Sequence, residues 1–137
     1  RCGELIDFGI GEVSVDYINK EGITRANSAA FYNAVWDLKQ KPNFVLVDGE
    51  NPVPVWDRST QIWKPTADAK WWPVGAASIL AKVIRDRLMA EFHRDYPHYG
   101  WDENSGYGTA KHNKALKEHG PCPLHRTKFI EKIVGAS

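Results

Sequence analysis

Two stretches of the chain carry apolar residues at helical spacing. From Ile23 to Leu38 apolar side chains recur every three or four positions, and Pro42 limits the helix that this spacing predicts. The stretch from Val74 to Phe92 predicts the strongest helix, and its small first residues allow close approach to another backbone. Its predicted core-facing stripe consists of Ala76, Ile79, Leu80, Val83 and Met89.

Three shorter stretches have strand-like patterns. Residues 4–11 alternate apolar and polar side chains, as a half-buried strand does. The compact apolar run from Asn43 to Asp48 ends before Gly49 and predicts a buried central strand. Residues 51–65 contain three prolines and form a connection, in which residues 61–63 are a candidate short strand.

The C-terminal third of the chain predicts a glycine-rich loop followed by helices. The loop covers residues 100–108, Thr109 caps a polar helix that ends near Gly120, and Phe129 to Val134 forms one or two helical turns. The alternation of strands and helices favours an α/β layer structure. At 137 residues the chain fits one domain, residues 1–137.

Composition narrows the class of protein. Hydrophobic residues make up 42% and charged residues 26%, and no apolar stretch is long enough to span a bilayer. Cys2 and Cys122 lack CxxC spacing, so we expect free thiols in a reducing cytoplasm, and the start of the chain has no signal-peptide pattern. Because the chain begins with Arg1, we expect an N-terminal part that was cut, left out or made as another polypeptide.

The net charge of +1 hides an asymmetry between the two halves. Residues 1–68 hold 7 Lys or Arg against 10 Asp or Glu, whereas residues 69–137 hold 11 against 7 and all five histidines. A basic half suits a polyanion, because each phosphate contact releases a counterion. An ordinary solvated surface explains the charge equally well.

Two aspartates suggest a metal site. Asp48 ends the most buried strand candidate, where a carboxylate is expensive unless it is paired or bound to a cation, and Asp68 lies 20 residues further on. If the segment between them folds back beside the strand, the two carboxylates meet and need a cation or a proton. Hard oxygen ligands favour Mg²⁺ or Mn²⁺ over zinc. Taken singly, each aspartate is more often a helix cap or a turn residue.

Lys82 and Asp86 lie four residues apart on the long predicted helix. That spacing puts them on one helix face, which favours a structural ion pair. The alternative for Asp86 is a supporting role beside a functional site.

The loop at residues 106–109 places Tyr107 between two glycines, where backbone can approach a ligand closely, and His112 follows one helical turn later. A tyrosine in such a place can stack on a sugar or base, although a tight turn with a packed ring explains the pattern nearly as well. His125 and Arg126 form a cationic pair suited to phosphate, with a helix-capping pair near Lys128 as the alternative.

Four motifs in order along the chain resemble the C-terminal half of the ribonuclease HII (type 2 ribonuclease H) family. They are VLVDG at 45–49, AASILAKVIRDRLM at 76–89, YPHYGWDENSGYGTAKHNKALKEHGPCP at 96–123 and HRTKF at 125–129, and residues 9–35 fit more loosely. The resemblance implies a ribonuclease H-like α/β fold, with a mixed sheet flanked by helices and a C-terminal helical extension over about residues 109–137.

The resemblance also implies roles for single residues. Asp48 and Asp68 match two catalytic, metal-binding acids, and Tyr107 matches the tyrosine that recognises the ribonucleotide at an RNA–DNA junction through its 2′-hydroxyl. Lys82, His125 and Arg126 are further substrate-binding candidates, while Asp86 and His112 are supporting or structural candidates. Most bacterial members have Gly-Asp where this chain has Ala67-Asp68.

The family's first strand carries an Asp-Glu pair followed by a Gly-Arg-Gly run, and no such motif occurs in these 137 residues. The resemblance therefore implies that the first strands of the family fold, with two of four metal-binding acids, are missing from this chain. We expect a fragment or one part of a split enzyme, whose partner is the N-terminal segment as a separate chain.

The implied activity is hydrolysis of RNA paired to DNA. With two Mg²⁺ or Mn²⁺ ions, the complete protein would cut the RNA of RNA–DNA hybrids and cleave on the 5′ side of ribonucleotides embedded in duplex DNA, leaving 5′-phosphate and 3′-hydroxyl ends. One alternative is a non-catalytic nucleic-acid-binding remnant of the same fold. Another is an unrelated metal-dependent phosphotransfer protein.

Overall fold

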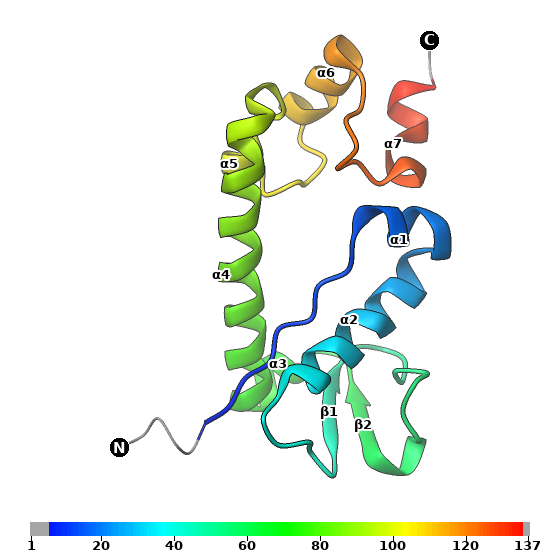
Figure 1. The fold of residues 1–137 in the computed structure, drawn as a ribbon, viewed down its shortest axis with the longest axis vertical. Coiled ribbons are helices and arrows are strands. Elements are labelled where there is room, and N and C mark those ends of the chain that lie inside the picture. Colours follow the sequence, from blue (N-terminus) through cyan, green and yellow to red (C-terminus); the bar gives the residue numbers. More distant parts are fainter. Residues whose placement is uncertain (1–5, 136–137) are drawn as a thin grey trace. The chain divides into compact units, whose positions relative to one another are not determined.

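A computed structural model describes residues 6–135. The chain divides into two compact units, residues 1–80 and 81–137, and the expectation of a single domain stays a prediction. The first unit contains α1 Val15–Glu21, α2 Ile23–Asp37, β1 Val45–Asp48, the 3-10 turn η2 Arg58–Thr60, β2 Gln61–Lys64, α3 Ala67–Lys70 and the start of α4 Trp72–Asp95 (Figure 1). The second contains the rest of α4, the 3-10 turn η3 Pro97–Tyr99, α5 Trp101–Asn104, α6 Ala110–His119 and α7 Thr127–Val134.

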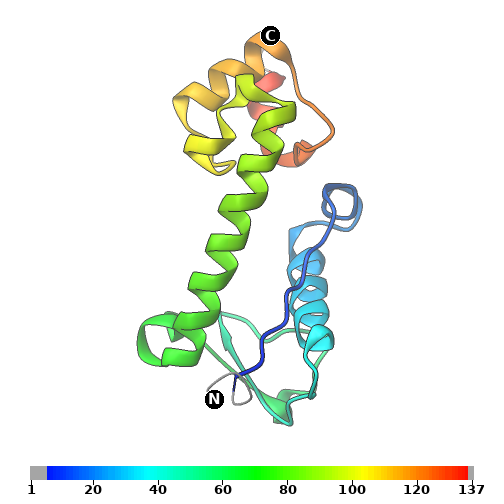
Figure 2. The same cartoon turned by 60° about the vertical axis from the view of Figure 1, so that its left-hand side comes forward.

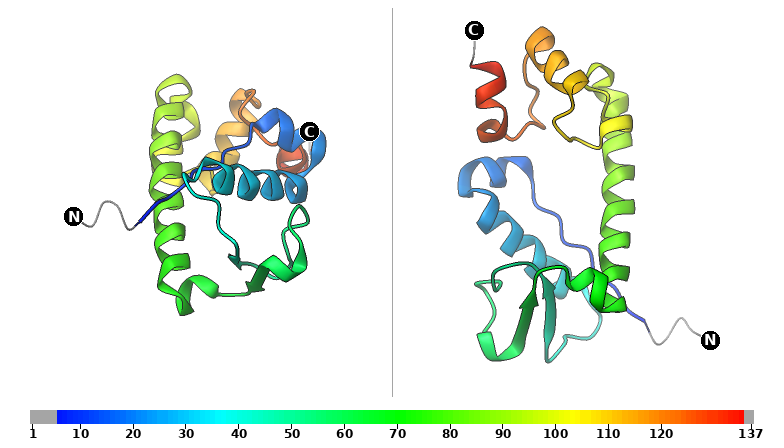
Figure 3. Two further views of the ribbon diagram at one scale, coloured as in Figure 1. Left: turned by 60° about the horizontal axis from the view of Figure 1, so that its bottom comes forward. Right: turned by 180° about the vertical axis from the view of Figure 1, so that it is seen from behind.

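The sheet of the described residues is one parallel pair, β1 and β2, which lie side by side in Figures 1 and 3. Val45 pairs with Gln61, and the register ends where Asp48 pairs with Lys64. Both strands were predicted, and the mixed α/β class is confirmed. The expectation of a buried central strand is only partly met, because Val47 alone is buried in β1.

The connection from β1 to β2 is held by one buried side chain. The Gln61 amide accepts a hydrogen bond from the backbone N–H of Val53 and donates to the carbonyls of Val53 and Trp56, at 2.9 to 3.1 Å. Burying an amide is favourable only when its hydrogen bonds are satisfied. Gln61 therefore fixes the loop that precedes its own strand.

The strand predicted at residues 4–11 is wrong over its described part, which is coil. This segment lies along α2 instead of beside a strand. A Cβ at Gly9 would collide with the carbonyl oxygen of Ala34, and one at Gly11 would collide with that of Ala30. The two glycines let the backbone rest directly on the helix, so their role is close packing and not strand alternation.

The helices predicted at residues 23–38 and 74–92 are confirmed by α2 and α4. The predicted core stripe of α4 is wrong for most of its length. Ile79 is 67% and Val83 41% exposed, Ala76 is exposed, and only Met89 is buried. Amphipathic spacing predicts which face is apolar, but burial also needs an element to cover that face.

The second unit has a continuous aromatic and aliphatic core. Figure 2 shows α5, α6 and α7 gathered around the C-terminal turns of α4. The buried cluster consists of Met89, Tyr99, Trp101, Ala115, Leu116 and Ile130. The hydroxyl of Thr109 caps α6 by accepting from the N–H of His112, as predicted, and Gly120 ends that helix at φ +73°. The last helix begins two residues before its predicted start.

No helix within the described residues combines the length and the apolar character that crossing a membrane requires. Cys122 is a free cysteine. The expectation of a free thiol at Cys2 falls outside the described residues.

Candidate functional site

The carboxylate of Asp48 reaches from the end of β1 to the start of α3. Its Oδ1 accepts a hydrogen bond of 2.8 Å from the backbone N–H of Ala67, which is fully buried, and Asp68 is the next residue along the chain. The segment between the two aspartates thus folds back beside β1, which is the condition set for their meeting. The hydrogen bond brings the Asp48 carboxylate to the start of α3, while Oδ1 of Asp68 accepts from the backbone N–H of Ala69 at 2.9 Å.

Two backbone features hold Asp68 at this place. Thr66, directly before α3, has left-handed angles of φ 58° and ψ 34°, which turn the chain from β2 into α3. The backbone of Asp68 lies against Gly75 of α4, where a Cβ would come within 2.8 Å of the Asp68 carbonyl oxygen. The close approach is made by Gly75, directly before the small residues 76–78 for which the sequence predicted it.

Burial does not require a cation at Asp48, in contrast to the expectation from the sequence. Both Asp48 and Asp68 are exposed, so neither carboxylate suffers a desolvation cost that a cation must relieve. Residues 6–135 contain no group of three or more His, Cys, Asp or Glu that could hold a metal ion. Two exposed carboxylates do fit Mg²⁺ or Mn²⁺, which are commonly held by one or two carboxylates, water and substrate phosphates.

In the second unit, Tyr107 is presented to solvent. Its side chain is 70% exposed, and its backbone N–H donates to the carbonyl of Asn104 at 2.8 Å. The alternative of a packed ring in a tight turn therefore does not describe this tyrosine. The loop before it contains two consecutive left-handed residues, Ser105 and Gly106.

Lys82 and Asp86 form the ion pair that their spacing predicts, at 2.7 Å. Asp86 also accepts a 2.8 Å hydrogen bond from the hydroxyl of Ser105, which the sequence gave no reason to expect across 19 positions. Hydrogen bonds from Lys82 and Ser105 lower the pKa of Asp86, and the bond to Asp86 raises the pKa of Lys82. Both groups are thereby kept charged.

His112 and His125 pack inside the second unit. His112 is 5% and His125 6% exposed, and their rings stack with centroids 5.4 Å apart. Nδ1 of His112 lies 3.2 Å from the carbonyl of Tyr99, and Nδ1 of His125 accepts from the N–H of Cys122. Burial lowers the pKa of His125, so this structure presents no charged His125 to a phosphate.

Arg126 keeps a partly exposed guanidinium, which lies over the ring of Phe129 at 4.2 Å from its centroid. Burial, followed by the like charge of Arg85, lowers the pKa of Arg126 from its usual value. Arg85 instead donates to the carbonyl of Ser105 at 3.0 Å, a contact that the sequence did not predict.

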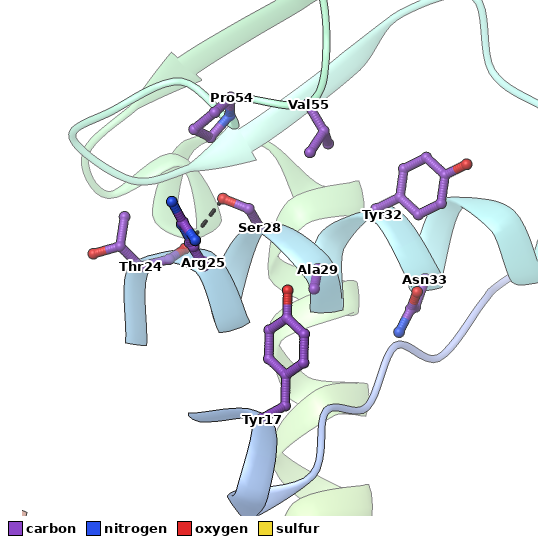
Figure 4. Close-up of a pocket in the computed structure, with 9 residues that line it drawn as sticks. All are labelled: Tyr17, Thr24, Arg25, Ser28, Ala29, Tyr32, Asn33, Pro54 and Val55. Carbon is purple, nitrogen blue, oxygen red and sulfur yellow. Dashed lines mark hydrogen bonds between the residues drawn. The ribbon is translucent and has the colours of Figure 1, made fainter. Parts of the chain in front are cut away.

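A cavity of about 430 Å³ in the first unit does not include the candidate acids. Figure 4 shows the residues that line it, which come from α1, α2 and the loop after β1. They are Tyr17, Thr24, Arg25, Ser28, Ala29, Tyr32, Asn33, Pro54 and Val55. The lining is mainly apolar, and its arginine is paired with Glu21 at 2.7 Å, so the cavity offers no free charge to a ligand.

The described residues form a mixed α/β fold with a small parallel sheet and several helices. The structure is similar to the crystal structure of the ribonuclease H2 from Pyrococcus horikoshii OT3, with a TM-score of 0.66 and 24% identity, over 90% of this chain and 66% of that one. At this identity the likeness shows the fold alone.

Sequence comparison makes the assignment specific. The family model described as Ribonuclease HII matches residues 4–132, and the chain belongs to the ribonuclease HII family. It is 47% identical over 128 residues to the ribonuclease HII of Syntrophobacter fumaroxidans, covering 93% of this chain and 53% of that protein. The corresponding protein of Caldanaerobacter subterraneus is 42% identical over 131 residues, with coverages of 96% and 54%. The chain thus spans about half the length of these curated relatives.

Proposed function

We propose that this chain is part of a metal-dependent endonuclease that cuts RNA paired to DNA. Its substrates are RNA–DNA hybrids and DNA duplexes with embedded ribonucleotides, which it cleaves on the 5′ side of the ribonucleotide. Family membership supports the class of reaction. The observation that supports the site is the hydrogen bond from the N–H of Ala67 to Asp48, because it brings the Asp48 carboxylate to the start of α3, where Asp68 is the next residue.

The reaction is hydrolysis of a phosphodiester. A bond forms between the oxygen of water and phosphorus, the bond from phosphorus to the 3′ oxygen breaks, and the products are a 5′-phosphate and a 3′-hydroxyl. Asp48 and Asp68 would hold the divalent cations, Mg²⁺ or Mn²⁺. A pair of bound ions supplies positive charge to the phosphate and lowers the pKa of water.

The second unit supplies contacts to the nucleic acid. The exposed ring of Tyr107 can lie against a ribose, where the 2′-hydroxyl separates RNA from DNA. Lys82, with a 73% exposed side chain, and the partly exposed Arg126 are suited to backbone phosphates. His125 is buried and does not need to touch the substrate.

The site needs further acids to bind two ions, because the described residues place no third carboxylate beside Asp48 and Asp68. We propose that a segment with an Asp-Glu pair and a Gly-Arg-Gly run completes it, on the same polypeptide or as a separate chain. Such an enzyme would act in the cytoplasm, where the chain's thiols stay reduced.

The test is reconstitution. The chain is mixed with a separately made segment of this kind, and both are incubated with a DNA duplex that contains one ribonucleotide and with Mg²⁺. Nicking that requires both pieces, and that Asp48→Asn abolishes while Asp57→Asn does not, supports the proposal. Binding without cleavage would instead support the non-catalytic remnant. Cleavage that ignores the ribose would support an unrelated phosphotransfer protein.

A further inference from the structure

The loop before Tyr107 has a backbone that needs external support. Ser105 and Gly106 both lie in the left-handed region, with φ of +47° and +78°. Glycine tolerates this region, whereas serine is strained there. A strained residue persists only where its surroundings hold it, so the contacts of Ser105 decide how firmly Tyr107 is placed.

Those contacts come from α4. The hydroxyl of Ser105 donates to Oδ1 of Asp86 at 2.8 Å, and Nη2 of Arg85 donates to the carbonyl of Ser105 at 3.0 Å. Gly106 then packs flat on the same helix, since a Cβ there would lie 3.0 Å from Cε of Met89. The turn is thus attached to α4 at its strained residue and at the glycine that follows it.

Asp86 also binds the ammonium group of Lys82, one turn earlier on α4. Its second oxygen, Oδ2, accepts from Nζ of Lys82 at 2.7 Å. The hydrogen bond to Asp86 is the main cause of the raised pKa of Lys82. An ordinary surface ion pair would explain only one of the two bonds that Asp86 makes.

We propose that Asp86 is a positioning residue for ribonucleotide recognition, which fixes the Ser105–Tyr107 turn through the Ser105 hydroxyl and holds the Lys82 ammonium through its second oxygen. The inference rests on the proposed function, in which Tyr107 meets the ribose. Asp86 itself does not touch the substrate. Its carboxylate acts through the serine and the lysine that it holds.

The first experiment measures kcat/KM of the reconstituted enzyme on a duplex with one ribonucleotide and on a continuous RNA–DNA hybrid. Misplacing a contact group by about 1 Å can cost up to about 100-fold, so Asp86→Ala should lower the single-ribonucleotide value by about 10- to 100-fold. Asp86→Asn keeps an oxygen for the Ser105 hydroxyl but puts an NH2 group where Lys82 needs an acceptor, so its kcat/KM on the single-ribonucleotide duplex should lie between those of the wild type and Asp86→Ala. Glu103→Gln, which breaks the exposed 2.6 Å pair with Lys111, is the matched control and should change neither value.

The second experiment asks whether Asp86 acts through Tyr107. Groups that act as a unit are not additive, so adding Asp86→Ala to Tyr107→Ala should cause little further loss. Fully additive losses would overturn the proposal. If Tyr107→Ala keeps the wild-type preference for ribose, the proposed role of Tyr107 fails instead.

A third readout needs no activity. The Gly106 N–H, which donates to Oδ1 of Asn104 at 2.8 Å, should exchange its hydrogen faster in Asp86→Ala and Ser105→Ala than in the wild-type chain and in Glu103→Gln. Unchanged exchange in both variants would show that Asp86 does not hold the turn, whatever the activity of the enzyme.

Discussion

Thr66 lies in the left-handed region at the turn before α3, so substitutions of Thr66 test whether this turn is strained. An L-residue in this region is strained by about 1–2 kcal/mol, and a β-branched side chain lies at the upper end of that range. Thr66→Gly removes this strain, but glycine loses about 0.5–1 kcal/mol more chain entropy on folding. The mutant also loses the exposed 2.6 Å bond from the Thr66 hydroxyl to the carbonyl of Pro65, worth less than about 0.5 kcal/mol at the surface.

The balance predicts that Thr66→Gly stabilises the chain by roughly 0.5–1 kcal/mol and raises Tm by about 2–4 °C. Urea and thermal unfolding, followed by circular dichroism and tryptophan fluorescence, measure both quantities. Thr66→Ala keeps a Cβ in the left-handed region and should gain less. A Thr66→Gly variant that is less stable than the wild type, or a Thr66→Ala variant that gains as much, would refute strain at this turn.

Three further predictions concern packing and pH. Leu116→Ala empties a fully buried position and should lower the free energy of unfolding by about 3 kcal/mol, whereas Lys117→Ala on the exposed face of α6 should change it by less than about 0.5 kcal/mol. Gly11→Ala drives a Cβ into the carbonyl oxygen of Ala30 and should cost about 1–3 kcal/mol in the same urea titration. The folded-state pKa of His125 lies below its unfolded value near 6.5, so its stabilising effect is complete above about pH 6.5 and is lost as the pH falls toward the folded pKa. The free energy of unfolding should fall between pH 7 and pH 5, and it should fall less in His125→Gln. The same pH dependence in His125→Gln and the wild type would contradict the role of His125.

The elements that local signals specify were predictable from the sequence. The helical spacing in α2 and α4, the apolar run of β1 and the Thr109 cap each depend on neighbouring residues only. Helix α1 was missed although Ser14 caps it by accepting from the N–H of Tyr17, because seven residues are too few for a clear apolar period.

The sequence did not predict which element packs against each apolar face. The alternation at residues 4–11 suggested a strand, yet Gly9 and Gly11 pack on α2, since alternation does not say what lies opposite. The stripe of α4 is apolar but mostly uncovered among the described residues, and Ile79 stays exposed.

The candidate site was likewise only partly predictable from the sequence. Asp48 and Asp68 could be named from strand ends and motifs, whereas the hydrogen bond from the N–H of Ala67 to Asp48 required the fold. Ser105 was not predictable, because a serine beside a glycine is usual in any loop and its partner Asp86 is 19 positions away.

We propose that Asp48 and Asp68 bind the same divalent cation, one of the two that the complete site would hold. Mn²⁺ added in small amounts to the ¹⁵N-labelled chain should broaden the backbone amide signals of Asp48, Ala67 and Asp68 together, and excess Mg²⁺ or Asp48→Asn should remove the effect. Broadening centred on other acids, such as Asp57, or persisting unchanged in Asp48→Asn, would contradict the account.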